Sequence, residues 1–204
     1  MNIRKRHLSL VLIFSLALSF WSLSACQSWR MKIKNFEQNF VGLSMTLHSY
    51  DENSRVIDSL HGNNVSIRRN TTFDSSEESG DSPVVTVSIG KHELTHVGSS
   101  LILYEDGLEN LFETFDQHVH VDNLDRSIPI INRLAHDFAN KFTGRQKIIL
   151  IRSQNGSPLA TFAGKKVSLD KTDVPKSTAL LIDGRYLFIY RCDYTIYDSE
   201  LFDK

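Results

Sequence analysis

Short runs rich in β-branched and aromatic residues, separated by turn residues, follow one another in the same order in both halves of the chain. In the first half these runs occupy residues 43–50, 56–60, 65–67, 84–89 and 100–104. In the second half they occupy residues 147–153, 158–162, 167–169, 178–182 and 186–197. Runs of this length, bounded by Gly, Asn, Asp and Ser, are typical of β-strands. The chain is therefore predicted to be rich in antiparallel β-sheet.

The two halves also share short motifs. Gly-x-x-Val-Ser followed by an apolar residue occurs at residues 62–67 and again at 164–169, and a Gly-basic pair follows at residues 90–91 and 184–185. Residues 155–156 (Asn-Gly) form the strongest hairpin signal in the chain. This shared order predicts an internal repeat, residues 43–107 and 147–201. The alternative is that two unrelated series of β-hairpins resemble each other by chance.

Two segments between the halves have helical spacing. Residues 108–116 and 128–142 each place apolar side chains on one face of a helix. Ser127 can cap the second segment and Gly144 can end it. We therefore expect two similar small antiparallel β units joined by a helical hairpin. Together they would form a single α+β, β-rich domain over residues 43–204, after an N-terminal signal segment.

The N-terminus has the pattern of a secretory signal peptide. Arg4, Lys5 and Arg6 precede an apolar stretch at residues 8–21, which is too short for a transmembrane helix of about 20 apolar residues. Leu-Ser-Ala-Cys follows at residues 23–26 and matches the lipobox of bacterial lipoproteins. Residues 1–25 are thus predicted to be removed, leaving Cys26 lipidated as the new N-terminus. An uncleaved anchor is the alternative.

Residues 26–42 form a short polar lead after the lipidated cysteine. Trp29, Ile33, Phe36 and Phe40 recur at helical spacing among polar residues. This spacing predicts a short amphipathic helix that either packs on the domain or lies on the membrane surface.

The charge of the chain argues against nucleic-acid binding, and its two cysteines limit the possible disulfides. The signal segment holds three of the 23 basic residues and none of the 24 acidic ones, so the remainder is mildly acidic. Nucleic-acid binding requires a basic surface and is not expected. The membrane would be contacted through the lipid on Cys26. If that lipid is present, Cys192 has no partner for an intramolecular disulfide, and we interpret it as a buried structural thiol.

One segment has the pattern of a catalytic motif. Residues 92–96 (His-Glu-Leu-Thr-His) match the H-E-x-x-H pattern of zinc metallopeptidases. On a helix, His92 and His96 would bind one zinc ion and Glu93 would act as the general base. The candidates for a third ligand are Glu105, Glu109 and Glu113.

The surroundings of this motif favour a strand instead of a helix. A β-type run precedes it, Gly90 interrupts, and Gly98 follows at once. On a strand, positions four apart are about 13 Å apart, and two imidazoles at that distance are poorly placed to share a zinc ion. The preferred interpretation assigns no metal, no cofactor and no catalytic residue, with the zinc site as the alternative.

The lipobox, Trp29 near the anchor, and the segments at residues 155–156, 164–168 and 182–197 together carry a family resemblance. The chain resembles uncharacterised lipoproteins of low-GC Gram-positive bacteria, the group called domain of unknown function 5052. The resemblance covers most of the chain after the signal segment and is most specific at residues 148–197. It implies a surface lipoprotein with a β-rich domain, and it brings no catalytic residues.

Three functions follow as hypotheses. The first is a lipoprotein on the extracytoplasmic side of the cell membrane, anchored through Cys26, that binds an envelope protein or a small ligand and is not an enzyme. The second is an extracellular zinc metallopeptidase that uses His92, Glu93 and His96. The third is a structural role in which the paired β units mediate self-association.

Overall fold

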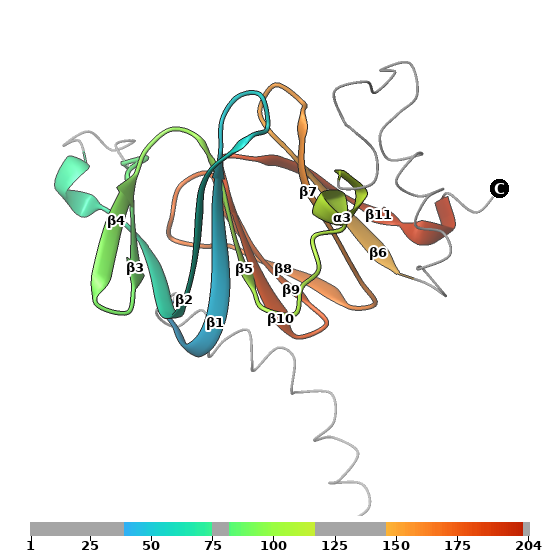
Figure 1. Cartoon of the computed structure of the whole chain (residues 1–204), viewed down its shortest axis with the longest axis horizontal. Helices are drawn as coiled ribbons and strands as arrows, with labels where there is room; N and C mark the ends of the chain where they lie inside the picture. The colour runs from blue at the N-terminus through green and yellow to red at the C-terminus, as the bar shows by residue number, and fades with distance from the viewer. Residues whose placement is uncertain (1–38, 75–81, 117–145, 202–204) are drawn as a thin grey trace, which may run out of the picture. The chain divides into compact units, whose positions relative to one another are not determined.

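The computed structural model describes residues 39–74, 82–116 and 146–201, which all belong to one compact unit, residues 38–204 (Figure 1). The predicted signal peptide, Cys26 and residues 26–38 of the lead lie outside the described residues. Phe40, expected on a helix of that lead, instead belongs to the first strand, which begins at Asn39.

The described chain forms eleven strands in two antiparallel sheets. The first five are β1 (Asn39–Tyr50), β2 (Val56–Arg69), β3 (Val85–Ile89), β4 (His92–His96) and β5 (Ser100–Glu105). The others are β6 (Lys147–Arg152), β7 (Pro158–Gly164), β8 (Val167–Asp170), β9 (Ser177–Ile182), β10 (Arg185–Tyr190) and β11 (Asp193–Asp198). Two short 3-10 helices, η1 (Thr71–Phe73) and η3 (Ser199–Leu201), follow β2 and β11.

Eight strands form the larger sheet, in the order β4-β3-β2-β1-β5-β10-β9-β8. Three strands form the smaller sheet, in the order β11-β6-β7. Among the described strands, β4 and β8 are therefore the edges of the large sheet, and β11 and β7 are the edges of the small one (Figure 1). We call β1–β5 the first meander and β6–β11 the second meander.

The second meander repeats the strand pairing of the first. β6 pairs with β7 and β11 as β1 pairs with β2 and β5. β9 pairs with β8 and β10 as β3 pairs with β2 and β4. The registers agree as well: Met45 pairs with Gly62, and Lys147 pairs with Gly164. We call two residues counterparts if they occupy the same position in the strand pairing of the two meanders. That the two meanders arose by duplication stays a prediction.

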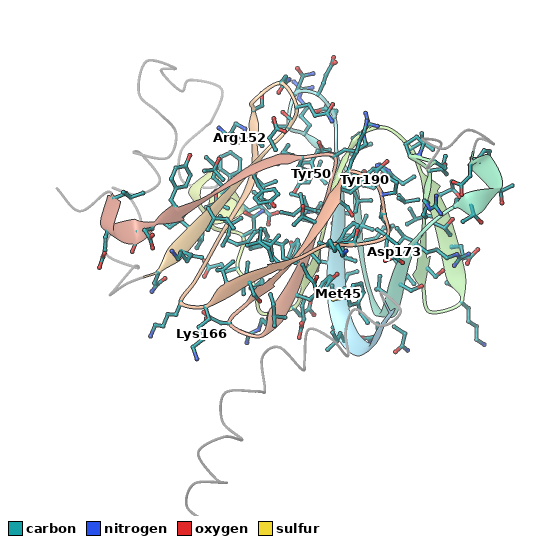
Figure 2. The ribbon with its side chains drawn as sticks, turned by 180° about the vertical axis from the view of Figure 1, so that it is seen from behind. Met45, Tyr50, Arg152, Lys166, Asp173 and Tyr190 are labelled. Atoms are coloured by element: carbon teal, nitrogen blue, oxygen red, sulfur yellow. The ribbon has the colours of Figure 1, made fainter. Side chains whose placement is uncertain are left out.

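The meanders differ at one bend. β2 is continuous, whereas its counterpart is divided into β7 and β8 at Lys165 and Lys166 (Figure 2). The Asp183 carboxylate accepts the backbone N–H of Lys165 at 3.0 Å and of Lys166 at 2.8 Å. The counterpart of Asp183 is Gly90, which has no side chain to hold such a bend. The division leaves β8 in the large sheet and β7 in the small one.

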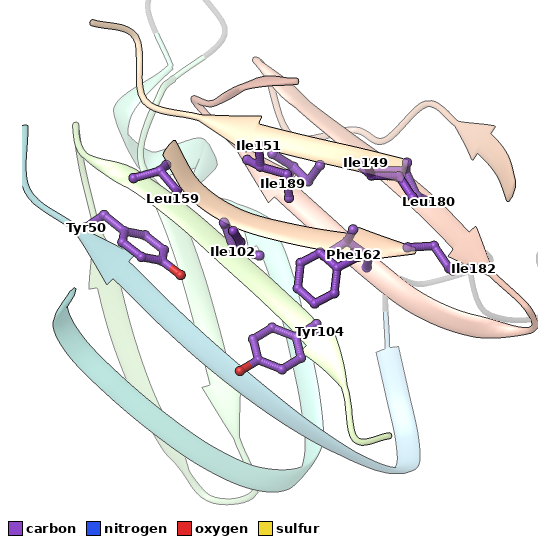
Figure 3. Packing of buried hydrophobic residues seen from close by; sticks show 12 residues of the cluster. Tyr50, Ile102, Tyr104, Ile149, Ile151, Leu159, Phe162, Leu180, Ile182 and Ile189 are labelled. Carbon is purple, nitrogen blue, oxygen red and sulfur yellow. The ribbon is translucent and has the colours of Figure 1, made fainter. Parts of the chain in front are cut away.

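The two sheets share a core (Figure 3). Side chains from β1 and β5 meet side chains from β6, β7, β9 and β10 in one buried cluster. Its members are Tyr50, Ile102, Tyr104, Ile149, Ile151, Leu159, Ala160, Phe162, Leu180, Ile182, Leu187 and Ile189. Because side chains alternate between the two faces of a strand, every second residue of β5 and β10 lies in this cluster, and the residues between them are buried on the opposite face.

The expected α+β fold with a helical hairpin is wrong, because the described fold is nearly all β-sheet. The only α-helix among the described residues is α3 (Leu111–Asp116), of 6 residues. Gly107 turns the chain with φ of 86°, and Asn110 caps the helix by accepting the Phe112 N–H at 3.2 Å. The predicted helix over residues 108–116 is thus shortened at its start. The second expected helix, residues 128–142, lies outside the described residues.

The apolar spacing in this segment marks a buried face and not a long helix. Leu111 and Phe112 are buried, and α3 packs beside β7 (Figure 1). Leu108, which precedes the cap, packs against the core cluster without being helical. Asn110 Oδ1 also accepts the Thr161 N–H at 3.0 Å, so this segment covers the outer edge of β7.

Candidate functional site

The His-Glu-Leu-Thr-His segment is strand β4, an edge of the large sheet. It pairs with β3 from His92 opposite Ile89 to His96 opposite Val85. His92 and His96 are four positions apart on the strand, which separates their backbones by about 13 Å. A zinc site with both histidines as ligands needs a helical turn, so this geometry gives the metallopeptidase alternative no support.

Glu93, the base of that alternative, is engaged in surface contacts. Its carboxylate accepts from Arg68 Nη2 at 3.0 Å and from Ser88 Oγ at 3.0 Å. Hydrogen bonds from Arg68 and then Ser88 lower the pKa of Glu93 below its ordinary value. A carboxylate held in the charged form by a guanidinium is a weak general base.

His96 is held by structural contacts. Its Nε2 lies 2.9 Å from the backbone oxygen of Ser99, and its ring meets the ring of Tyr190 edge-on at 5.9 Å. His92, by contrast, is exposed. Within residues 39–74, 82–116 and 146–201, no group of three or more His, Cys, Asp or Glu side chains is placed to hold a metal ion.

The candidates for a third zinc ligand lie in unrelated places. Glu105 is on β5, where its Oε2 accepts the Tyr186 N–H at 2.9 Å. Glu109 is exposed in the turn before α3. Glu113 is on α3 and pairs with His48 of β1. The structure brings none of them together with both His92 and His96.

A polar cluster on β1, β2 and the end of β5 went unnoticed in the sequence. His61 Nε2 lies 2.9 Å from Asp106 Oδ2 and 3.0 Å from Ser44 Oγ, while Thr46 Oγ1 donates to Asp106 Oδ1 at 3.4 Å. Hydrogen bonds from His61 and then Ser44 lower the pKa of Asp106 below its ordinary value. His61 and Asp106 remain largely exposed.

This cluster has the residue types of a Ser-His-Asp triad but not the geometry. In a triad the carboxylate binds one ring nitrogen of the histidine, and the other ring nitrogen takes the serine proton. Here Ser44 and Asp106 both approach Nε2 of His61. The imidazole therefore cannot accept a proton from Ser44 on one side while Asp106 orients it from the other.

A second polar group lies further along β1, under α3. His48 Nδ1 is 3.3 Å from Glu113 Oε1, and Asn110 Nδ2 donates to the same oxygen at 2.8 Å. The contact with His48 and, after it, the Asn110 amide hold the pKa of Glu113 below its ordinary value against the opposing effect of burial. Burial raises the pKa of Tyr104, whose ring meets that of His48 edge-on, to about 12. The group joins α3 to β1; His48 and Asn110 are buried, and the Glu113 side chain is partly exposed.

Among the described residues, Cys192 has a free thiol, and its side chain is partly buried. Its Sγ donates to the backbone oxygen of Tyr190 at 3.2 Å. Burial raises the pKa of the Cys192 thiol to about 12. The thiol therefore stays protonated at neutral pH, and it lacks the depressed pKa of a nucleophilic cysteine.

The family model described as domain of unknown function (DUF5052) matches residues 6–202, which is nearly the whole chain. The chain belongs to the DUF5052 family. No curated protein and no solved structure matches it. The resemblance seen at residues 148–197 and in the N-terminal segment thus identified the right family, while the family description states no activity.

For this DUF5052 member, the described residues include two polar groups along β1 and sheet edges at β4, β8, β11 and β7. No helix in the described ranges is long and apolar enough to span a membrane. The two polar groups shared a sequence signal, because Ser44, Thr46 and His48 alternate and so lie on one face of a strand. The partner carboxylates, Asp106 in the first group and Glu113 in the second, are distant in sequence, so the pattern alone does not reveal either group.

Proposed function

We propose that this DUF5052 protein is exported, lipidated on Cys26 and held on the extracytoplasmic side of the cell membrane, where its β-domain binds another envelope component. The observation that carries the anchoring is the order of basic residues, apolar stretch and Leu-Ser-Ala-Cys over residues 4–26. Two or three acyl chains on one cysteine would bind a bilayer firmly, since each buried CH₂ contributes about 0.8 kcal/mol.

The geometry of the domain favours binding over catalysis. Ser44 and Asp106 share one nitrogen of His61, Glu93 is paired with Arg68, and the Cys192 thiol is protonated. None of these groups is arranged as a nucleophile with its base. Exposed apolar side chains on β2, in contrast, suit contact with a partner; they are Val56, Ile57 and Leu60.

Cys26→Ser in the natural host tests the anchor. The unaltered protein is expected in the membrane fraction, to incorporate a labelled fatty acid, and to be degraded when intact cells are treated with protease. Cys26→Ser should lose the label and leave the membrane fraction, whereas the matched variant Cys192→Ser should keep both. A Cys26→Ser protein that keeps the label, or equal losses in Cys26→Ser and Cys192→Ser, would contradict the proposal.

Cross-linking on intact cells tests the binding role. A membrane-impermeant lysine cross-linker is expected to join the protein to a defined envelope component. Loss of this adduct on changing Ile57 and Leu60 to Ser, with the fold unchanged, would assign the contact to β2. Hydrolysis of envelope peptides that depends on Glu93 and on added zinc would overturn the binding role in favour of the peptidase.

A further inference from the structure

We propose that copies of this chain associate head to tail, by pairing strand β11 of one copy with strand β4 of the next. This inference rests on the binding role proposed above for the exposed side chains of β2 and names a second copy as the partner that covers them; it does not depend on the lipid anchor. It rests on the way in which the two meanders already join within one chain.

Inside the chain, the first meander joins the second through β5 and β10. These strands pair antiparallel, with Leu101 opposite Tyr190 and Tyr104 opposite Leu187. The junction is further closed by the Glu105 carboxylate, which accepts the Tyr186 N–H at 2.9 Å. The two meanders are thus joined by the pairing of β5, the last strand of the first meander, with β10 of the second meander.

The counterparts of these two strands are sheet edges. β11 is the counterpart of β5, because β6 pairs with β11 as β1 pairs with β5. β4 is the counterpart of β10, because β3 pairs with β4 as β9 pairs with β10. Among the described strands, β11 and β4 each pair along one side only. An edge of this kind is a template for strand addition by another chain.

Apolar side chains that the internal junction buries in one meander are exposed in the other. Ile57 is 58% exposed, whereas its counterpart Leu159 is 2% exposed. Val97 is 58% exposed, and its counterpart Tyr190 is fully buried. Leu60 is 39% exposed and its counterpart Phe162 is fully buried, while Leu201 is 65% exposed and its counterpart Leu108 is partly buried against the core. If β11 of one copy paired with β4 of the next as β5 pairs with β10, the junction would cover these exposed side chains.

The internal register specifies the contacts between copies. Thr95 of one copy would lie opposite Ile196 of the next, as Phe188 lies opposite Leu103. Tyr104 packs against Phe162 with ring centroids 5.3 Å apart, and the corresponding pair is Tyr197 with Leu60. The first contact is a cross-strand pair of the kind that stabilises antiparallel sheets, and the second closes the space between the two sheets, because Tyr104 and Phe162 belong to different sheets.

Polar counterparts complement one another across the proposed junction. Arg152, at the end of β6, is the counterpart of Tyr50 (Figure 2), and Asp58 is the counterpart of Ala160. Tyr50 and Ala160 belong to the same buried cluster. The guanidinium of Arg152, which donates to Thr195 at 2.8 Å, and the carboxylate of Asp58, which accepts from Ser49, would therefore face the same part of the proposed junction. Asp198 is the counterpart of Glu105 and keeps a carboxylate at that position, where it pairs with Lys147 at 2.6 Å within the chain. Such a heterologous contact builds rings or open chains of copies.

Disulfide trapping tests the register. The full chain is purified in mild detergent with Cys26→Ser and Cys192→Ala, so that no native thiol remains, in two versions that carry Thr95→Cys or Ile196→Cys, and the two are mixed and oxidised. We expect a cross-linked dimer in the mixture, none in either version alone, and a ladder of oligomers when one chain carries both changes. The matched control replaces Ile196→Cys with Leu169→Cys on β8, the opposite edge. No dimer in the first mixture, or an equal yield with the control, would overturn the proposal.

A second measurement does not depend on added cysteines. Val97→Lys places a charge in the proposed junction, and Phe73→Lys places one on an equally exposed apolar residue of η1, outside it. We expect Val97→Lys to raise the concentration for half-maximal association by about tenfold or more, and Phe73→Lys to leave it unchanged. Sedimentation velocity over a concentration series measures both. A monomer at all concentrations, or equal effects of the two changes, would refute head-to-tail pairing.

Discussion

A β-carbon on Gly62 would overlap the Cγ2 methyl group of Ile89. The same relationship holds between their counterparts, Gly164 and Ile182. In both meanders the chain passes so close to a branched side chain that only glycine fits. The Gly-x-x-Val-Ser motif thus records a steric requirement of the fold that is met twice.

Alanine at either glycine is expected to destabilise the protein. Gly62→Ala or Gly164→Ala should lower the free energy of unfolding by about 1–3 kcal/mol, because a rigid, branched neighbour must be displaced. Urea unfolding followed by circular dichroism measures the change. Combining Gly62→Ala with Ile89→Ala should remove most of the added loss. Equal effects of Gly62→Ala in both backgrounds would rule out the steric explanation.

Asn110 is expected to matter through its acceptor oxygen. That oxygen caps α3 and also satisfies the buried N–H of Thr161. Asn110→Ala should therefore lower the free energy of unfolding by about 1–3 kcal/mol. Asn110→Asp keeps the acceptor but places a second carboxylate beside that of Glu113, so the two substitutions are compared in the Glu113→Gln background, where Asn110→Asp should lose less than Asn110→Ala. A greater loss in the aspartate variant would show that the donor dominates.

Stability is expected to fall in acid partly because of Glu113. Its pKa in the folded protein is below the ordinary value of 4.5, so the stabilisation is present above that pH and is lost as the pH falls further. Glu113→Gln should show a shallower decline between about pH 5 and pH 3, by at most about 1 kcal/mol because the side chain is partly exposed. Unfolding free energies at matched pH test this, and parallel curves would contradict it.

The two histidines of β4 should behave differently. His92 is exposed, so His92→Ala should change the free energy of unfolding by less than about 0.5 kcal/mol. His96 contacts Ser99 and Tyr190, so His96→Ala should lower it by about 1 kcal/mol. Metal analysis of the same samples provides the contrast. A zinc ion lost equally in both variants would restore the metallopeptidase hypothesis.

Cys192 should resist alkylation in the folded protein. Because burial raises its thiol pKa to about 12, almost no thiolate is present near pH 8. Iodoacetamide should label Cys192 slowly in native protein and rapidly in guanidinium chloride, as measured by peptide mass spectrometry, which separates Cys192 from Cys26. Fast labelling without denaturant would mean that the thiol is accessible and reactive.

Much of the sheet was predictable because its signals are local. Asn155-Gly156 predicted the β6–β7 hairpin, and Gly156 has the positive φ of 87° that such a turn favours. The prediction of a helical hairpin was wrong. The spacing of Leu108, Leu111 and Phe112 indicates which residues are buried, but a buried residue need not lie on a helix. Asn110 and Gly107 set the start of α3 through contacts and a turn that spacing alone does not reveal.

The amino-acid sequence by itself determined the order of strands and turns, the family and the signal pattern at the N-terminus, because each depends on residues close together in the chain. Only the tertiary structure decided that residues 92–96 lie on a sheet edge, that His48 meets Glu113 and that His61 meets Asp106. Those contacts join segments far apart in sequence, and they depend on a strand register that is set by packing across the whole sheet.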